Sequence, residues 1–237
     1  MIKLTIDQGN SRTKLAVFEN DTIIQKEMDA SYSLVKTLIN QSNLSILSTV
    51  KSKSKYYDLL REDDIFLNTA TSLPITIKYH TPNTLGNDRV ALAVGGVHNF
   101  PKTDLLIIDL GSCITYDFIH SNHEFVGGGI SPGLKMRYKA LNQYTDCLPL
   151  LNPDLDKLTL TGKDTIESIH SGVINGMATE IDGIINRYVI KYPNLKTILT
   201  GGDLNFFDKV LKSSIFASPD LLMIGLNTIL DYNENNS

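Results

Sequence analysis

The sequence lacks several features that would assign it to a specialised class of protein. It has no tryptophan and only two cysteines, Cys113 and Cys147, among 237 residues. Two cysteines cannot build a disulfide framework, and their spacing is not that of metal ligands, so we expect both to be reduced. Lysine and arginine number 22 against 26 aspartate and glutamate residues, a formal net charge of −4. This balance argues against nucleic acid or an anionic membrane as a partner.

Long hydrophobic runs are also missing. The longest apolar stretch, 105–119, is interrupted by Asp109 and Asp117, so it is not expected to span a bilayer. The N-terminus reaches Asp7 before the apolar core of a signal peptide could form. With 42% hydrophobic and 20% charged residues, the composition is typical of a globular protein, which we expect to be cytoplasmic.

A short internal repeat is present instead. Residues 4–9 read Leu-Thr-Ile-Asp-Gln-Gly, and residues 106–111 read Leu-Ile-Ile-Asp-Leu-Gly. In both copies an apolar strand ends in Asp-x-Gly, and a second apolar strand follows after a short turn. One Asp-x-Gly is ordinary turn chemistry, but two copies that each open one half of the chain indicate a duplication.

The predicted elements divide into two similar α/β halves, 1–103 and 104–237. The first half has predicted helices at 32–41, 54–62 and 87–98 and predicted strands at 2–7, 13–19, 22–27, 45–50 and 75–79. The second has predicted helices at 132–143, 164–191, 204–212 and 219–232 and predicted strands at 104–109, 115–120, 123–130, 196–200 and 214–217. Three strands in hairpin order followed by alternating helices and strands, twice over, predict a duplicated ribonuclease H-like fold of the actin-like ATPase class. Its two halves are expected to lie around a cleft.

The turn after the first strand is the first candidate site, and its residues suit a phosphate group. Gly9 lets the backbone approach a ligand, successive turn N–H groups can bind an anion, and Lys14 adds positive charge. Asp7 could hold a magnesium ion through water. The alternative is a polar turn with a surface lysine, because short motifs often match by accident. The segment consists of Asp7, Gln8, Gly9, Asn10, Ser11, Arg12, Thr13 and Lys14.

The second copy of the turn, 109–117, has no lysine. Its Asp109 follows an apolar strand, where an unpaired carboxylate costs free energy unless a cation meets it. The alternative is a turn carboxylate that accepts backbone N–H groups. The repeat favours the cation.

A third candidate, Gly86-Asn87-Asp88-Arg89, precedes an apolar helix. Asp88 suits a general base, and Arg89 suits a carboxylate or phosphate bound through two hydrogen bonds. An acidic residue at a helix N-terminus beside a surface arginine explains the same letters. Taken alone, the segment favours this simpler account.

Glycines mark three further segments. Gly-rich turns lie at 127–133 and at 200–203, where bare backbone can contact a ligand or pack against another strand. Gly172 and Gly176 lie four residues apart in a predicted helix, where each costs about 1 kcal/mol relative to alanine. We therefore expect a close approach to that helix, by another helix in the simplest case.

In this order the motifs resemble the type III pantothenate kinases, the Bvg accessory factor family of the actin-like ATPase superfamily, over nearly the whole chain. The segments 7–14 and 109–117 resemble the two phosphate motifs of the family, and Tyr79 with 86–89 resembles its pantothenate-binding segment. The segment 162–165 is similar to one that reaches the substrate site of the partner subunit, and 127–133 and 200–203 also match. The chain departs from the usual pattern at Ser112 and Cys113, at Asn87 and at Asp164.

The resemblance implies phosphorylation of pantothenate to 4′-phosphopantothenate by ATP, the first step of coenzyme A biosynthesis, with Asp88 as the general base. It implies that 7–14 and Ser112 bind ATP with Mg²⁺, and that Asp109 binds a monovalent cation, K⁺ or NH₄⁺. It also implies a homodimer with the substrate site at the subunit interface. The implied substrate-binding residues are Tyr79, Gly86, Asn87, Asp88, Arg89 and Thr165.

Two alternatives remain open at this point. A kinase of the same superfamily that acts on a sugar or a carboxylate would share the phosphate motifs but not the Gly-x-Asp-Arg segment. A non-enzymatic regulator on the same fold would have no need of Asp7, Lys14, Asp88 and Asp109 together.

Overall fold

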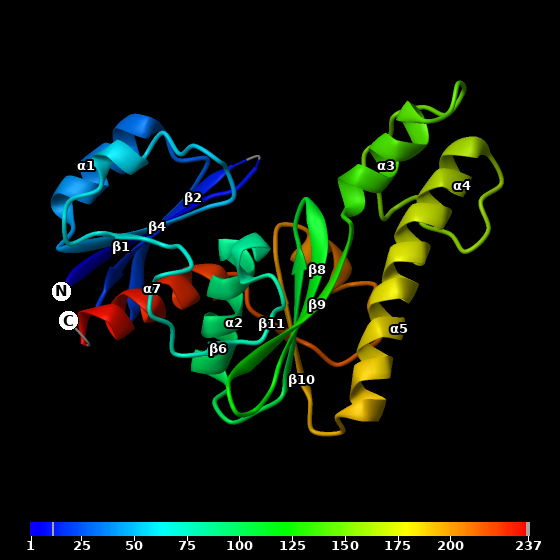
Figure 1. Ribbon diagram of the computed structural model, residues 1–237. Coiled ribbons are helices and arrows are strands. Elements are labelled where there is room, and N and C mark those ends of the chain that lie inside the picture. The colour runs from blue at the N-terminus through cyan, green and yellow to red at the C-terminus, as the bar shows by residue number, and fades with distance from the viewer. Residues whose placement is uncertain (11, 236–237) are drawn as a thin grey trace. The chain divides into compact units, whose positions relative to one another are not determined.

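The computed structural model describes residues 1–10 and 12–235 (Figure 1). By the contacts between its residues the chain forms two compact units. Unit 1 consists of 1–103, 119–127 and 220–237, and unit 2 consists of 104–118 and 128–219. The predicted division into 1–103 and 104–237 was based on the internal repeat. The two compact units are defined by contacts instead and do not test that division, which stays a prediction.

Unit 1 is built on a five-stranded sheet in the order β3-β2-β1-β4-β5. The strands β1, β2 and β3 are antiparallel neighbours, whereas β4 and β5 join in parallel. Their bounds are Ile2–Gln8 for β1, Thr13–Glu19 for β2, Thr22–Met28 for β3, Leu44–Thr49 for β4 and Ile65–Phe66 for β5.

Helices cover both faces of this sheet. Because side chains alternate along a strand, Leu4 and Ile6 of β1 face one side, where they pack with α1 (Tyr32–Gln41). Thr5 faces the other side, and its hydroxyl lies 3.3 Å from the sulfur of Met223 in α7 (Leu221–Glu234). The predicted last helix, 219–232, therefore forms at Leu221–Glu234 and belongs to unit 1.

The helix α2 (Asn87–Asn99) packs against α7, and Figure 1 shows the two side by side. Two glycines allow the close approach. A Cβ at Gly95 would collide with the carbonyl oxygen of Leu221, and a Cβ at Gly225 would collide with that of Ala91. The backbones of the two helices are therefore in direct contact.

The second sheet has the order β11-β10-β7-β8-β9-β6. Its strands are β7 (Leu105–Leu110), β8 (Cys113–Ile119), β9 (Glu124–Pro132), β10 (Lys196–Thr200), β11 (Phe216–Ala217) and β6 (Thr76–Ile77). The series β9-β8-β7-β10-β11 repeats the order β3-β2-β1-β4-β5 of the first sheet. The pairing also repeats, since Asp109 lies opposite Thr200 as Asp7 lies opposite Ser48. Sheet order and pairing are those expected of a duplicated ribonuclease H-like fold.

Unit 2 carries most of the remaining helices. They are α3 (Leu134–Gln143), α4 (Thr165–His170), α5 (Gly176–Lys191) and α6 (Leu204–Phe207). A π-helical turn, Ser171–Asn175, joins α4 to α5, so the long helix predicted at 164–191 forms with one irregular turn.

Some predicted bounds were wrong. The segment 54–62 contains only a short 3₁₀ turn, Tyr57–Leu59, because Tyr56 is fully buried and its hydroxyl donates to Thr13 Oγ1 at 3.2 Å. The first residue of α3 is Leu134, because Pro132 still belongs to β9. The helix predicted at 204–212 ends at Phe207. No helix in the described part of the chain combines the length and apolar character needed to cross a membrane.

Candidate active site

Asp7, the next-to-last residue of β1, has a buried carboxylate. The side chain is 5% exposed and accepts a hydrogen bond from the Ser48 hydroxyl at 3.1 Å. Burial, and then the negative charge of Asp88, raise the pKa of Asp7 to about 6, although Ser48 and Lys14 act in the opposite direction. The structure therefore brings Asp7 and Asp88, two residues singled out from separate motifs, into electrostatic contact within unit 1.

The first phosphate turn follows directly. The Gly9 N–H donates to the Arg12 carbonyl oxygen at 3.0 Å, which closes the turn. Gly9 has no positive φ, and a Cβ there would lie 3.4 Å from the Arg12 carbonyl oxygen, close to ordinary contact distance, so the turn itself does not require glycine. Asn10 and Arg12 are exposed, Gln8 is buried, and Thr13 and Lys14 are half-buried. Ser11 lies outside the described residues.

The start of α2 places the predicted substrate segment. Gly86 is the N-cap residue, and Asp88 lies half-buried in the first helical turn. The Arg89 side chain is buried, with its guanidinium carbon 5.6 Å from the centre of the Tyr79 ring and 5.7 Å from that of Phe125. The rings hold the guanidinium by cation–π attraction. The predicted neighbours Tyr79 and Arg89 are therefore brought together.

In unit 2, Asp109 occupies the position that corresponds to Asp7. Its carboxylate lies against Gly201, where a Cβ would collide with Oδ1, and close to Gly111, where a Cβ would lie 3.5 Å from Oδ2. Gly201 also has φ of +99°, which side chains rarely adopt. The backbone at Gly201 therefore packs directly against the Asp109 carboxylate, an approach that a side chain at this position would prevent.

The second phosphate turn rests on the Gly-rich end of β9. The Gly111 N–H donates to the Cys113 carbonyl oxygen at 3.1 Å, and Ser112 is exposed at the tip. Gly133 lies against the carbonyl oxygens of Gly111 and Ser112, where a Cβ would not fit. Gly133, the last glycine of the segment 127–133, therefore supports the turn by close backbone packing.

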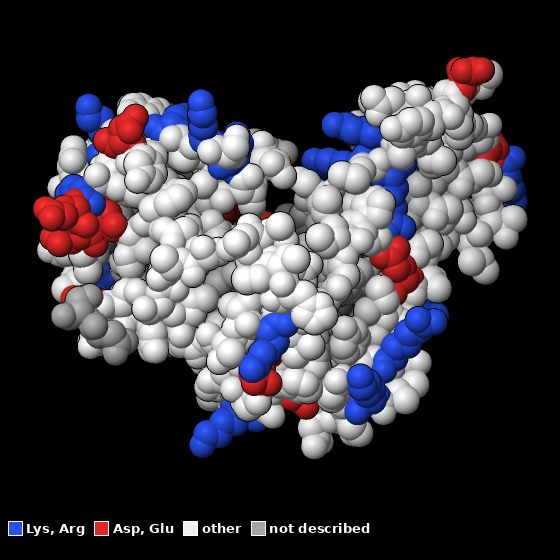
Figure 2. Space-filling model, viewed as in Figure 1, with Lys and Arg blue, Asp and Glu red and all other residues white. Residues whose placement is uncertain are grey.

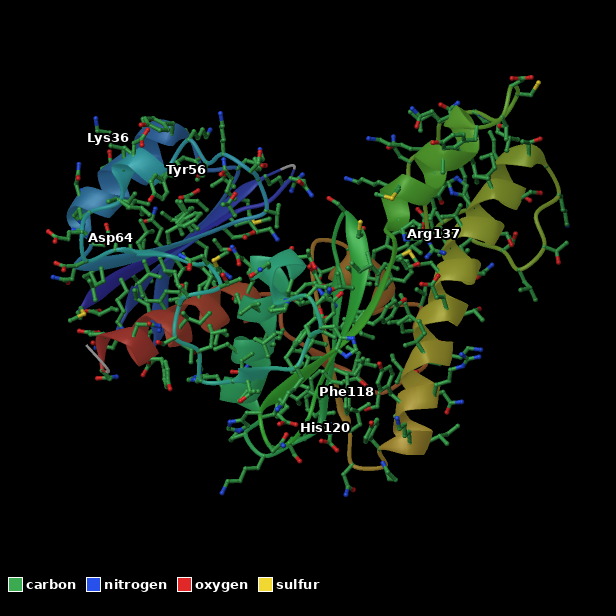
Figure 3. All side chains as sticks on the ribbon, in the orientation of Figure 1. Lys36, Tyr56, Asp64, Phe118, His120 and Arg137 are labelled. Atoms are coloured by element: carbon green, nitrogen blue, oxygen red, sulfur yellow. The ribbon has the colours of Figure 1, made fainter. Side chains whose placement is uncertain are left out.

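An ion pair that the sequence analysis missed holds this support. Arg137 of α3 donates to Glu180 of α5 at 2.5 Å, to Ser131 Oγ at 3.0 Å and to the Pro132 carbonyl oxygen at 2.8 Å. Figure 3 shows Arg137 between α3 and α5. Glu180 also accepts from the Tyr116 hydroxyl at 2.9 Å. No sequence signal identifies this group, because its members come from four elements.

Thr165 lines a cavity of about 1020 Å³ between α3 and α4. The cavity wall is largely apolar, and Arg137 and Lys163 contribute positive charge. Asp164 caps α4 by accepting from the Glu167 N–H at 2.8 Å, which positions Thr165 as the first helical residue. Among the described residues, Thr165 alone of the predicted site residues lines this cavity.

On the face in Figure 2, basic and acidic side chains are scattered rather than gathered into one surface.

A model of the type III pantothenate kinase family matches residues 3–187. The chain belongs to the type III pantothenate kinase family. The type III pantothenate kinase of Flavobacterium psychrophilum is 40% identical over 238 residues, covering 97% of this chain and 98% of that relative. Family membership confirms the resemblance read from the ordered motifs, and with it the predicted enzyme class, a kinase.

Solved structures agree with this family at the level of the fold. A Campylobacter jejuni protein described as a Baf family transcriptional activator has a TM-score of 0.65 and 21% identity, covering 98% of this chain and 99% of that one. The activator of 2-hydroxyisocaproyl-CoA dehydratase from Clostridium difficile, solved with ADPNP bound, has a TM-score of 0.57 and 12% identity, covering 100% and 97%. The predicted actin-like fold class is confirmed.

Proposed function

We propose that this chain transfers the γ-phosphoryl group of ATP to the primary hydroxyl of pantothenate, giving ADP and 4′-phosphopantothenate on the way to coenzyme A. The observation that supports it most is the first turn of α2. That turn carries Asp88, whose charge helps to raise the pKa of Asp7, and holds Arg89 against Tyr79.

Asp88 acts as the general base. Its half-buried carboxylate accepts the proton of the pantothenate hydroxyl as the hydroxyl oxygen forms a bond to the γ-phosphorus. The bond between that phosphorus and the bridging oxygen breaks, and ADP leaves. Arg89 binds the pantothenate carboxylate, because a guanidinium held by contacts with two rings presents its N–H groups in a fixed plane.

The first phosphate turn, 7–14, and Ser112 bind ATP. Asp7 fits a role beside Mg²⁺, since a buried carboxylate with a raised pKa regains its charge when a cation approaches. When bound, the magnesium ion neutralises charge on the phosphate oxygens. Asp109 fits a monovalent cation, K⁺ or NH₄⁺, because its half-buried carboxylate lies near the end of an apolar strand, where a cation offsets the cost of burying the charge.

The active form is a cytoplasmic homodimer in which Thr165 reaches the pantothenate site of the partner subunit. Two observations support a second copy. Gly172 and Gly176 have nothing from elsewhere in the described chain within 4 Å of a Cβ, so among the described residues no group makes the close approach expected at these two glycines. Tyr144 and Leu160, 85% and 86% exposed, leave apolar surface near the cavity that Thr165 lines.

The test is an ADP-release assay with pantothenate and with a panel of sugars and carboxylic acids. We expect pantothenate to be the preferred substrate, and Asp88→Asn to lower kcat by about 100-fold or more while ATP still binds. Asp58→Asn, at an exposed carboxylate in the turn Tyr57–Leu59, is the control. Preference for a sugar would favour the alternative kinase, and near-normal turnover of Asp88→Asn would remove Asp88 from the mechanism.

A further inference from the structure

The first turn of α2 carries Asp88 without a capping side chain. Gly86 stands at the N-cap position, and the Asp88 carboxylate accepts from the N–H of its own neighbour Arg89 at 2.8 Å. A helix start of this kind frays readily, because its first N–H groups other than that of Arg89 have no partner within the helix. Another contact must hold Asp88 in place.

Asn87, the first residue of α2, makes that contact. Its amide nitrogen lies 2.8 Å from the carbonyl oxygen of Leu67, which follows β5, and 3.4 Å from that of Thr49, which ends β4. Carbonyl oxygens only accept hydrogen bonds, so both partners require the NH₂ group and define the orientation of the amide. Since the group has two hydrogens, both are used inside the protein.

Thr49 continues the connection to the first phosphate turn. Its hydroxyl lies 3.1 Å from Oε1 of Gln8 and 3.3 Å from the Gln8 carbonyl oxygen, and it accepts from the Lys51 N–H at 3.0 Å. Gln8 is 3% exposed and immediately precedes Gly9, which opens the turn. Asn87, Thr49 and Gln8 therefore link the helix that carries Asp88 to the phosphate turn, all within unit 1.

We propose that Asn87 is a positioning residue, which holds Asp88 at a fixed place relative to the first phosphate turn through Thr49 and Gln8. The inference rests on the proposed function, since it gives Asp88 the role of base. Asn87 then contributes to catalysis without contacting pantothenate, because its two donors are already used. Displacing a catalytic group by about 1 Å can cost about 100-fold in rate, so the loss should appear in kcat.

The variants are Asn87→Ala, which removes both donors, and Thr49→Val, which removes the hydroxyl at nearly constant shape. Thr49→Ser keeps the hydroxyl as the conservative variant of the second link. Asn99→Ala, at the exposed last residue of the same helix, controls for an Asn→Ala change in α2. For each, kcat, the KM values for pantothenate and ATP, and the thermal unfolding midpoint are measured.

We expect Asn87→Ala to lower kcat by about 10- to 100-fold, with the KM for ATP within about twofold of the wild type. Thr49→Val should lower kcat in the same direction, and Thr49→Ser should recover most of the loss. In an Asp88→Asn background, Asn87→Ala should lower kcat by no more than about twofold, because residues that act as a unit are not additive.

Three results would overturn the inference. One is a raised KM for pantothenate with unchanged kcat, which would mean that Asn87 contacts the substrate. Another is a lower unfolding midpoint with unchanged kcat, which would mean a structural role alone. The third is a full further loss in the Asp88→Asn background. A wild-type enzyme inactive on pantothenate would overturn the proposed function and this inference together, whereas the other results overturn the inference in an active enzyme.

Discussion

Replacing Asp7 with asparagine should stabilise the protein at neutral pH while it removes activity. The buried carboxylate has a pKa of about 6 in the folded protein against an ordinary value of 3.8. At about 1.4 kcal/mol per pH unit, the difference of about 2.2 means that ionised Asp7 costs the folded state about 3 kcal/mol. Asparagine occupies the same volume, still accepts from Ser48 and carries no charge, so this cost disappears.

The sign of the pH dependence follows from the raised pKa of Asp7. Below about pH 4 both folded and unfolded states are protonated at Asp7, and the residue contributes nothing. Between about pH 4 and pH 6 the unfolded state loses the proton while the folded state keeps it, so this group lowers wild-type stability as pH rises. Above about pH 6 the cost is constant.

Urea unfolding of wild type and Asp7→Asn from about pH 4 to pH 8, with a chelator to exclude magnesium, measures the effect. The variant should match the wild type near pH 4 and be about 3 kcal/mol more stable near pH 7. Asp88→Asn should give a smaller gain at neutral pH, because the Asp88 charge is the second cause of the raised pKa after burial. A variant that is less stable at pH 7, or a difference independent of pH, would refute the reasoning.

Three further predictions concern packing, the cation and assembly. Gly225→Ala should destabilise the protein by about 1–3 kcal/mol in thermal unfolding, because the new Cβ meets the Ala91 carbonyl oxygen and separates α2 from α7. The control is Gly183→Ala, where a Cβ would have nothing within 4 Å, and it should be neutral or slightly stabilising. Activity should need K⁺ or NH₄⁺ and fall in Na⁺ at equal ionic strength. Asp109→Asn should abolish both this cation preference and most of the activity. Equal rates in K⁺, Na⁺ and a bulky organic cation would contradict the cation site. Exchange of subunits between inactive Asp88→Asn and inactive Thr165→Arg chains should restore about a quarter of wild-type sites, because half of the dimers are mixed and each has one intact composite site. Mass spectrometry can check that mixed dimers form. If they form but stay inactive, Thr165 acts within its own chain.

Local pattern was enough to predict much of this protein from its sequence. Apolar strands that end in Asp-x-Gly identified β1 and β7, and their repetition predicted a duplicated fold, which the matching order of the two sheets bears out. These features depend on neighbours in the chain, through strand alternation and turn chemistry. The same ordered motifs identified the family, and the resemblance, rather than the four residues 86–89 alone, singled out Asp88 and Arg89 as candidate site residues.

Long-range contacts decided the rest. The segment 54–62 has a helical pattern, but burial of Tyr56 against Thr13 leaves only one short turn. The raised pKa of Asp7 comes from its burial and from the charge of Asp88, a residue of α2 that is far from Asp7 in the sequence. Asn87 appeared as one letter of a motif, and only the positions of Thr49 and Leu67 show where its amide is used. A sequence pattern carries the preferences of residues a few positions apart, whereas burial, charge proximity and hydrogen bonding between segments exist only once the chain is folded.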